Sequence, residues 1–144
     1  MKVFLDANVL FSAALPASRM GRFLGVVGNQ AELASSQAAV DEARRNVERK
    51  APDAALAVRN LQTLLKKTSL TSRAAELPGV ELVEKDRHIL GAAVASQCSH
   101  LLTGDERHFR HLFGKTVNGV KVVHAAMLAE EIGLRPDHPG RGSA

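Results

Sequence analysis

Three aspartates stand close behind apolar segments that otherwise carry little charge. Asp6 follows "VFL", Asp86 lies three residues beyond "VELV", and Asp105 follows "LLTG". A buried carboxylate without a partner is costly, so each of these acids needs a hydrogen-bond donor, a cation or access to water. Each also has a simple structural explanation, as a turn residue at Asp6, a helix N-cap at Asp86 and a Gly-Asp turn at Asp105.

The three apolar segments are expected to be neighbouring strands of one sheet, which would bring the three carboxylates together at one edge. Carboxylates that share a site repel each other, and a bound cation relieves that repulsion. A cluster rich in oxygen and poor in thiols suits Mg²⁺ or Mn²⁺. Zinc fits less well, because the six histidines show no tight Cys/His ligand spacing. The sequence therefore predicts a magnesium or manganese site.

A fourth acid is expected from a helix predicted over residues 37–48. Three acids of this helix compete for the role: Asp41, Glu42 and Glu48. On a helical wheel, Glu42 lies slightly nearer the apolar stripe than Asp41 does. The margin is thin, and a solvated helix face explains Glu42 equally well from periodicity alone.

The elements that must position these acids alternate along the chain. Strands are predicted at residues 3–5, 31–34, 80–83, 100–105 and 117–123, the last broken at Asn118-Gly119. Helices are predicted at residues 20–27, 37–48, 52–65, 86–94, 109–112 and 127–132. Short apolar strands separated by helices are typical of a parallel sheet covered on both faces, so the predicted fold class is α/β.

Length and composition favour one domain of ordinary globular type. The chain has 144 residues with 45% hydrophobic content, and we expect the domain at residues 1–133 and a disordered tail at residues 134–144. Aromatic residues make up only 3%, all of them Phe, which disfavours a nucleic-acid reader that depends on aromatic stacking. The net charge of +4 favours a polyanionic partner only weakly.

The compartment is predicted from what the sequence lacks. The single Cys98 allows no intrachain disulfide, and we expect it to be a small buried residue. Met1 leads straight into an apolar segment without a basic leader. No apolar run approaches the ~20 residues that span a bilayer. A cytoplasmic protein without membrane contact is expected.

Four stretches of the sequence carry a family resemblance: "FLDANVLFSA", "AAVDEARRNV", "KDRHILGAAVASQCSHLLTGD" and "VKVV". They extend over residues 2–132. Together they resemble the PIN domain, the nuclease fold of VapC-type toxins in bacterial toxin–antitoxin pairs and of other RNA-processing enzymes. The resemblance implies a three-layer α/β/α sandwich around a central, mainly parallel sheet.

The resemblance also implies roles for individual residues. The family's acidic quartet, which is both catalytic and metal-binding, maps to Asp6, Glu42, Asp86 and Asp105. This mapping favours Glu42 over Asp41. Asn8 and Thr103 match positions that support the acidic centre by hydrogen bonding, and Ser12 is expected to assist near the first ligand.

The implied activity is Mg²⁺- or Mn²⁺-dependent hydrolysis of phosphodiester bonds in single-stranded RNA by an endoribonuclease. The preference for RNA comes from the family, because the chemistry does not use the 2′-hydroxyl. Further implied partners are a cognate antitoxin that blocks the acidic cleft and, as in many members, a second copy in a homodimer. Basic residues near the motifs could hold the phosphate backbone, although solvated surface charge explains them as simply: Arg44, Arg45, Lys85, Arg87 and Arg107.

Two other classes of protein also use acids of this kind. A phosphatase of the haloacid-dehalogenase type needs a second Asp where the chain has Asn8, and a response-regulator receiver domain needs a Lys after a strand, whereas Lys121 lies inside one. His88 and His108 follow acids and could contact substrate, but surface histidines are commoner. A PIN-like module that binds RNA or protein without cleavage, and a housekeeping RNA-processing nuclease, remain the alternatives.

Overall fold

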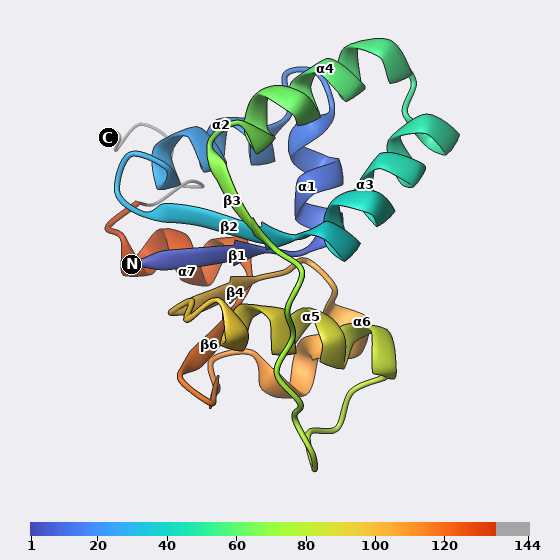
Figure 1. Ribbon diagram of the computed structural model, residues 1–144. Coiled ribbons are helices and arrows are strands. Elements are labelled where there is room, and N and C mark those ends of the chain that lie inside the picture. Colours follow the sequence, from blue (N-terminus) through green and yellow to red (C-terminus); the bar gives the residue numbers. More distant parts are fainter. Residues whose placement is uncertain (135–144) are drawn as a thin grey trace.

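Six strands form one sheet in the computed structural model, which describes residues 1–134 (Figure 1). The strands are β1 (Lys2–Leu5), β2 (Glu32–Ser36), β3 (Thr68–Thr71), β4 (His100–Leu102), β5 (Thr116–Val117) and β6 (Val120–Val123). Their order across the sheet is β3-β2-β1-β4-β6-β5. Every neighbouring pair is parallel except the β5–β6 hairpin, which is antiparallel.

Helices cover both faces of this sheet. They are α1 (Ala7–Ala14), α2 (Arg19–Val27), α3 (Gln37–Lys50), α4 (Ala54–Leu65), α5 (Glu84–Ala95), α6 (Glu106–Phe109), the 3₁₀ helix η1 (Arg110–Leu112) and α7 (Ala125–Glu131). Helix α1 packs against α2, α3 and α4 on one face, while α5 and α6 lie across the sheet on the opposite face (Figure 1). The prediction of an α/β fold with a central, mainly parallel sheet between layers of helices is confirmed.

The central strands are apolar because both of their faces are covered. Val3, Phe4 and Leu5 of β1 are fully buried, as are Leu101 and Leu102 of β4. Because the chain is poor in aromatic residues, most of the remaining core consists of Leu, Val and Ala side chains. This rigid centre fixes the positions of the residues that follow β1 and β4.

The prediction of a strand at residues 80–83 is wrong. That segment is irregular and leads into α5, and its apolar side chains Val80 and Leu82 pack partly buried against the core. The third strand is instead the polar edge strand β3, in which Leu70 is 45% exposed and no apolar alternation marks a buried face. Asp86 therefore does not follow a strand. It also does not cap α5, whose N-cap residue is Val83.

Smaller differences concern the ends of elements. The strand predicted at residues 117–123 is a hairpin, because Asn118 and Gly119 both have positive φ angles (48° and 88°), as a tight two-residue turn requires. The strand predicted at residues 100–105 ends at Leu102. Helix α1 lies where no helix is predicted from the sequence.

Two expectations concern the boundaries of the domain. Apart from Leu134, the tail predicted at residues 134–144 lies outside the described residues. Within the described part of the chain, no helix is long and apolar enough to cross a membrane.

Candidate metal centre

The carboxyl ends of β1 and β4 lie side by side where the strand order reverses. From β1 the chain builds outward to β2 and β3 on one side, and it later fills the other side with β4 and β6. Ligands of open parallel α/β sheets bind at such a reversal, outside the carboxyl ends of the strands. Asp6 directly follows β1, and Asp105 lies three residues after the end of β4. Two of the predicted acids thus reach this edge from neighbouring strands.

Asp6 is held rigidly at the end of β1. Its backbone N–H donates to the Leu102 carbonyl (3.1 Å), which continues the parallel ladder by one residue. One carboxylate oxygen accepts from the Ala7 backbone N–H (2.7 Å), and the other accepts from the Thr103 hydroxyl (2.7 Å). Because Asp6 is also the N-cap of α1, the strand end and the helix start together fix its position.

Ionisation of Asp6 is opposed by its surroundings. Burial raises the pKa of Asp6 from 3.8 to about 6, although the hydrogen bonds from Thr103 and Ala7 act against this rise. The negative charges of Asp86 and Glu42 make a smaller contribution to the same rise in pKa. A carboxylate that is rigidly placed and electrostatically disfavoured is suited to a cation ligand.

Thr103 and Asn8, which are predicted to support the acids, join the β1 end to the loop after β4. The fully buried Thr103 hydroxyl donates to Asp6 and accepts from the Asp105 backbone N–H (3.1 Å). The Asn8 side-chain oxygen accepts from the Gly104 N–H (3.1 Å). No side-chain hydrogen bond joins Ser12 to the acids within residues 1–134, so its role stays a prediction.

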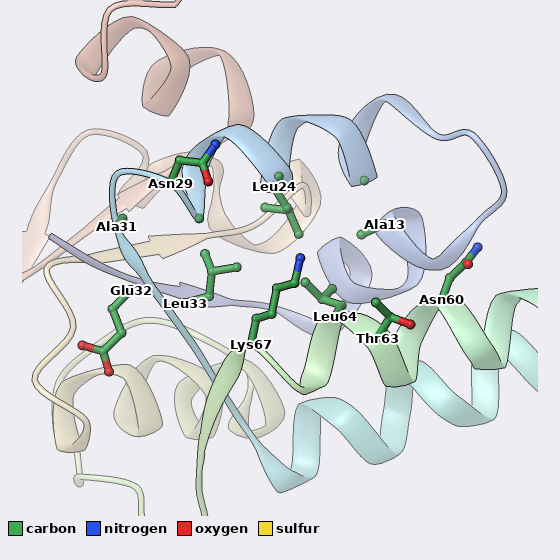
Figure 2. Close-up of a pocket in the computed structure, with 13 residues that line it drawn as sticks. Ala13, Leu24, Asn29, Ala31, Glu32, Leu33, Asn60, Thr63, Leu64 and Lys67 are labelled. Carbon is green, nitrogen blue, oxygen red and sulfur yellow. The ribbon is translucent and has the colours of Figure 1, made fainter.

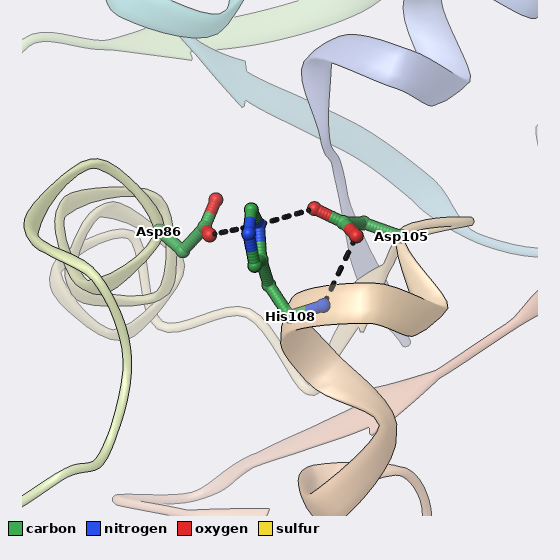
Figure 3. Close-up of side chains that lie close together, drawn as sticks. All are labelled: Asp86, Asp105 and His108. Carbon is green, nitrogen blue, oxygen red and sulfur yellow. Dashed lines mark hydrogen bonds and ion pairs between the residues drawn. The ribbon is translucent and has the colours of Figure 1, made fainter.

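Asp86 and Asp105 meet at the imidazole of His108 (Figure 3). The His108 Nδ1 atom lies 2.9 Å from Oδ2 of Asp86 and 2.9 Å from Oδ2 of Asp105. Asp105 also caps α6, because its Oδ1 accepts from the backbone N–H of His108 (3.1 Å). The sequence leaves His108 open between a substrate contact and an ordinary surface histidine; its spacing three residues after Asp105 is the signal that could have linked it to the acids.

Asp86 carries the unusual feature of this cluster. It lies in the first turn of α5 and is only 3% exposed. Its Oδ2 atom lies 2.9 Å from His108 Nδ1 but has no hydrogen-bond partner within residues 1–134. Burial raises the pKa of Asp86, and the positive charge available on His108 opposes that rise.

This donor set fits a divalent cation. One ligand atom from each of Asp86, Asp105 and His108 lies within 4.8 Å of the others. A buried carboxylate oxygen without a donor is costly in a folded protein, and a cation would satisfy it. Within the described residues, this is the only group of three or more such side chains with that spacing, and it includes neither Asp6 nor Glu42.

Glu42 lies at the rim of the centre on α3. Its carboxylate accepts from the Lys85 ammonium (3.1 Å), and this hydrogen bond raises the pKa of Lys85. Glu42 also raises the pKa values of Asp6 and Asp86 through its charge, which places it within electrostatic reach of both. Asp41, the alternative acid, instead accepts a hydrogen bond from Gln37 (2.9 Å) on the exposed helix surface.

Sequence comparison identifies the family of this chain. The family model described as "PIN domain" matches residues 2–107. The chain belongs to the PIN domain family. No curated protein matches the sequence.

Two solved structures share the fold of this PIN domain. The first is VapBC2 from Rickettsia felis bound to a DNA fragment from their promoter, with a TM-score of 0.63, 14% identity and coverage of 86% of this chain and 98% of that one. The second is FitAB bound to the IR36 DNA fragment, with a TM-score of 0.56, 19% identity and coverage of 85% and 94%. At these identities, the likeness shows the fold alone.

The five basic residues predicted to bind substrate differ in their surroundings in the PIN domain. Lys85 is paired with Glu42, and Arg87 is half-buried and donates to the Leu82 carbonyl (3.4 Å). The other three form no ion pair with any acid that the structure describes: Arg44, Arg45 and Arg107.

A hollow of about 420 Å³ lies away from the acids, on the helical face of the PIN domain (Figure 2). It is bounded by α2, α4 and the start of β2, with Leu24, Leu33 and Leu64 among its apolar walls and Lys67 at its edge. None of the predicted site residues lines it. The chemistry of the acids, rather than the size of this hollow, therefore marks the candidate site.

Proposed function

We propose that this PIN domain protein is a Mg²⁺- or Mn²⁺-dependent endoribonuclease that hydrolyses phosphodiester bonds of single-stranded RNA. The observation that carries the proposal is the buried Asp86 Oδ2, which lacks a hydrogen-bond donor in the described part of the chain and faces His108 and Asp105. Asp6 adds a disfavoured buried carboxylate at the same edge of the sheet. Such an arrangement destabilises the metal-free protein and is expected where a cation binds.

The four acids have separate roles in the proposal. A bound divalent cation supplies Lewis-acid chemistry, since it polarises a phosphoryl oxygen and lowers the pKa of water. Asp6 and Asp105 hold the cation directly, and Asp86 and Glu42 hold it directly or through water. Thr103 fixes the Asp6 carboxylate through its 2.7 Å hydrogen bond and prevents it from rotating away from the site.

Substrate binding is assigned to the basic residues around the acids. Arg44, Arg45 and Arg107 have no acidic partner in the described structure, so their guanidinium groups are available to phosphates. Lys85 and Arg87 lie beside Asp86 on α5 and add positive charge at the same opening. The preference for RNA over DNA rests on membership of the family.

The biological role that we propose is that of the toxin in a toxin–antitoxin pair, acting in the cytoplasm. The resemblance to VapC-type toxins supports this role, and two solved structures that share the fold, VapBC2 and FitAB, are bound to DNA fragments. The antitoxin would cover the acidic edge, and a second copy of the chain could complete a homodimer. A housekeeping RNA-processing role would instead leave growth unaffected when the protein is expressed alone.

Cleavage of a mixed-sequence single-stranded RNA tests the activity. We expect cleavage by the wild type with Mn²⁺ or Mg²⁺, none with EDTA, and a loss of about 100-fold or more in Asp6→Asn. Asp41→Asn is the matched control, because Asp41 lies on the exposed surface of α3, and it should cleave like the wild type. Metal binding without cleavage of any RNA would contradict the nuclease and favour a binding module.

A further inference from the structure

His108 places a nitrogen donor inside the carboxylate cluster. Its Nδ1 atom lies at 2.9 Å from one oxygen of Asp86 and at the same distance from one oxygen of Asp105, so the ring points between the two acids (Figure 3). The acidic quartet alone would offer a cation only oxygen ligands. The geometry therefore changes the kind of metal that the centre should prefer.

We propose that His108 is a metal ligand and that its imidazole makes the centre prefer a divalent transition-metal ion, with Mn²⁺ as the probe, over Mg²⁺. This inference rests on the proposed function, because it concerns the cation of that same site. It goes beyond the four acids in assigning a fifth residue to the centre and a selectivity to the ligand set.

The spacing of the three side chains supports the assignment. Neighbouring ligands of an octahedral ion with bonds of about 2.1 Å lie about 3.0 Å apart. The observed distances of 2.9 Å from His108 Nδ1 to each carboxylate oxygen agree with that separation. The burial of Asp86 is a second observation: the residue is 3% exposed, and its Oδ2 atom has no hydrogen-bond donor within residues 1–134.

The placement of His108 is fixed by its helix. Phe109, the next residue, is fully buried and anchors α6 in the core. The backbone N–H of His108 donates to Asp105 Oδ1, so the ligating acid and the histidine are held by the same short helical turn. The side chain of His108 is 39% exposed, which leaves a path for a cation from solvent.

The chemistry of the donors leads to the selectivity. Mg²⁺ favours oxygen ligands and loses water reluctantly, whereas imidazole is a common ligand of transition-metal ions. One nitrogen beside two carboxylates therefore strengthens the binding of a transition metal more than that of Mg²⁺. Replacing the nitrogen by an amide oxygen in His108→Gln should remove most of this difference.

Pulsed electron paramagnetic resonance of the Mn²⁺-loaded protein tests the ligand directly. We expect coupling to a histidine nitrogen in the wild type, its loss in His108→Gln, and its retention in His88→Gln. His88 is the matched control because it is an exposed histidine on α5, two residues beyond Asp86. A Mn²⁺ signal without nitrogen coupling in the wild type, or coupling that survives in His108→Gln, would overturn the inference.

Competition between the two cations tests the selectivity. The preference for Mn²⁺ over Mg²⁺, measured as the ratio of the two dissociation constants, should fall about tenfold in His108→Gln and stay unchanged in His88→Gln. Circular dichroism shows whether His108→Gln is folded. If the variant is unfolded, the presence or absence of nitrogen coupling in the wild type decides whether a histidine is a ligand. Wild-type protein that binds no Mn²⁺ would contradict the proposed function as well, whereas Mn²⁺ binding without nitrogen coupling contradicts only this inference.

Discussion

The carboxyl group of Asp6 shows how a single residue couples stability to function in this PIN domain. Burial raises its pKa to about 6, while Thr103 and Ala7 donate hydrogen bonds that favour the charged form. The folded, metal-free protein therefore binds a proton at Asp6 more tightly than the unfolded chain does. Stability contributed by that proton is present below pH 4 and is lost as the pH rises toward 6.

We predict that Asp6→Asn stabilises the metal-free protein above pH 6, by up to about 3 kcal/mol, because the variant avoids the buried charge. The advantage over the wild type should fade as the pH falls from 6 to 4, where Asp6 becomes protonated. Urea unfolding of both proteins in EDTA at several pH values measures this difference. A free-energy difference that does not change with pH would contradict the raised pKa of Asp6.

At the scale of elements, the position of Asp86 depends on how closely α5 approaches the segment before it. The Ala75 N–H donates to the Gly91 carbonyl (2.9 Å), and a Cβ atom on Gly91 would lie 2.2 Å from the Ala75 carbonyl oxygen. Gly91 thus allows a contact that no larger residue permits. Asp86 stands five residues earlier on the same helix and moves with it.

Gly91→Ala should destabilise the fold by about 1–3 kcal/mol, since either α5 or the segment around Ala75 must shift. Gly25→Ala is the matched control. Gly25 lies in helix α2, and no atom of residues 1–134 lies within 4 Å of an added Cβ, so the better helix propensity of Ala should leave stability unchanged or raise it by up to about 1 kcal/mol. Urea unfolding of both variants provides the measurement. Equal stability of Gly91→Ala and wild type would show that α5 is not held in this way.

Some elements of this fold could be predicted from the sequence, and others could not. The strands before Asp6 and Asp105 were predictable, because central parallel strands must be apolar on both faces and each ends at a polar residue. The edge strand β3 was not, because an exposed edge needs no apolar pattern. The cluster of Asp86 with His108 was missed as well, since it depends on the packing of α5 beside α6, which leaves no local pattern.

In the molecule as a whole, the candidate metal centre lies at one edge of the sheet, and the apolar core lies behind it. The PIN domain fold is shared with VapBC2 at a TM-score of 0.63 although only 14% of the residues are identical, so the arrangement of strands tolerates wide replacement of side chains. The acids lie at the reversal of strand order. The apolar core stabilises them little, and their charges repel one another. A cation that binds them stabilises the whole fold, by about 2.7 kcal/mol at a concentration one hundred times its dissociation constant.

The thermal unfolding of the protein with and without Mn²⁺ tests this account most directly, in wild type, Asp86→Asn and the control Asp41→Asn. We predict that Mn²⁺ raises the unfolding temperature of wild type and Asp41→Asn by about 5 °C or more. Asp86→Asn should show little or no rise, because the buried oxygen that faces the cation is no longer a carboxylate. Wild-type protein that is not stabilised by Mn²⁺, or an equal rise in Asp86→Asn, would contradict the proposal that these acids form a metal centre.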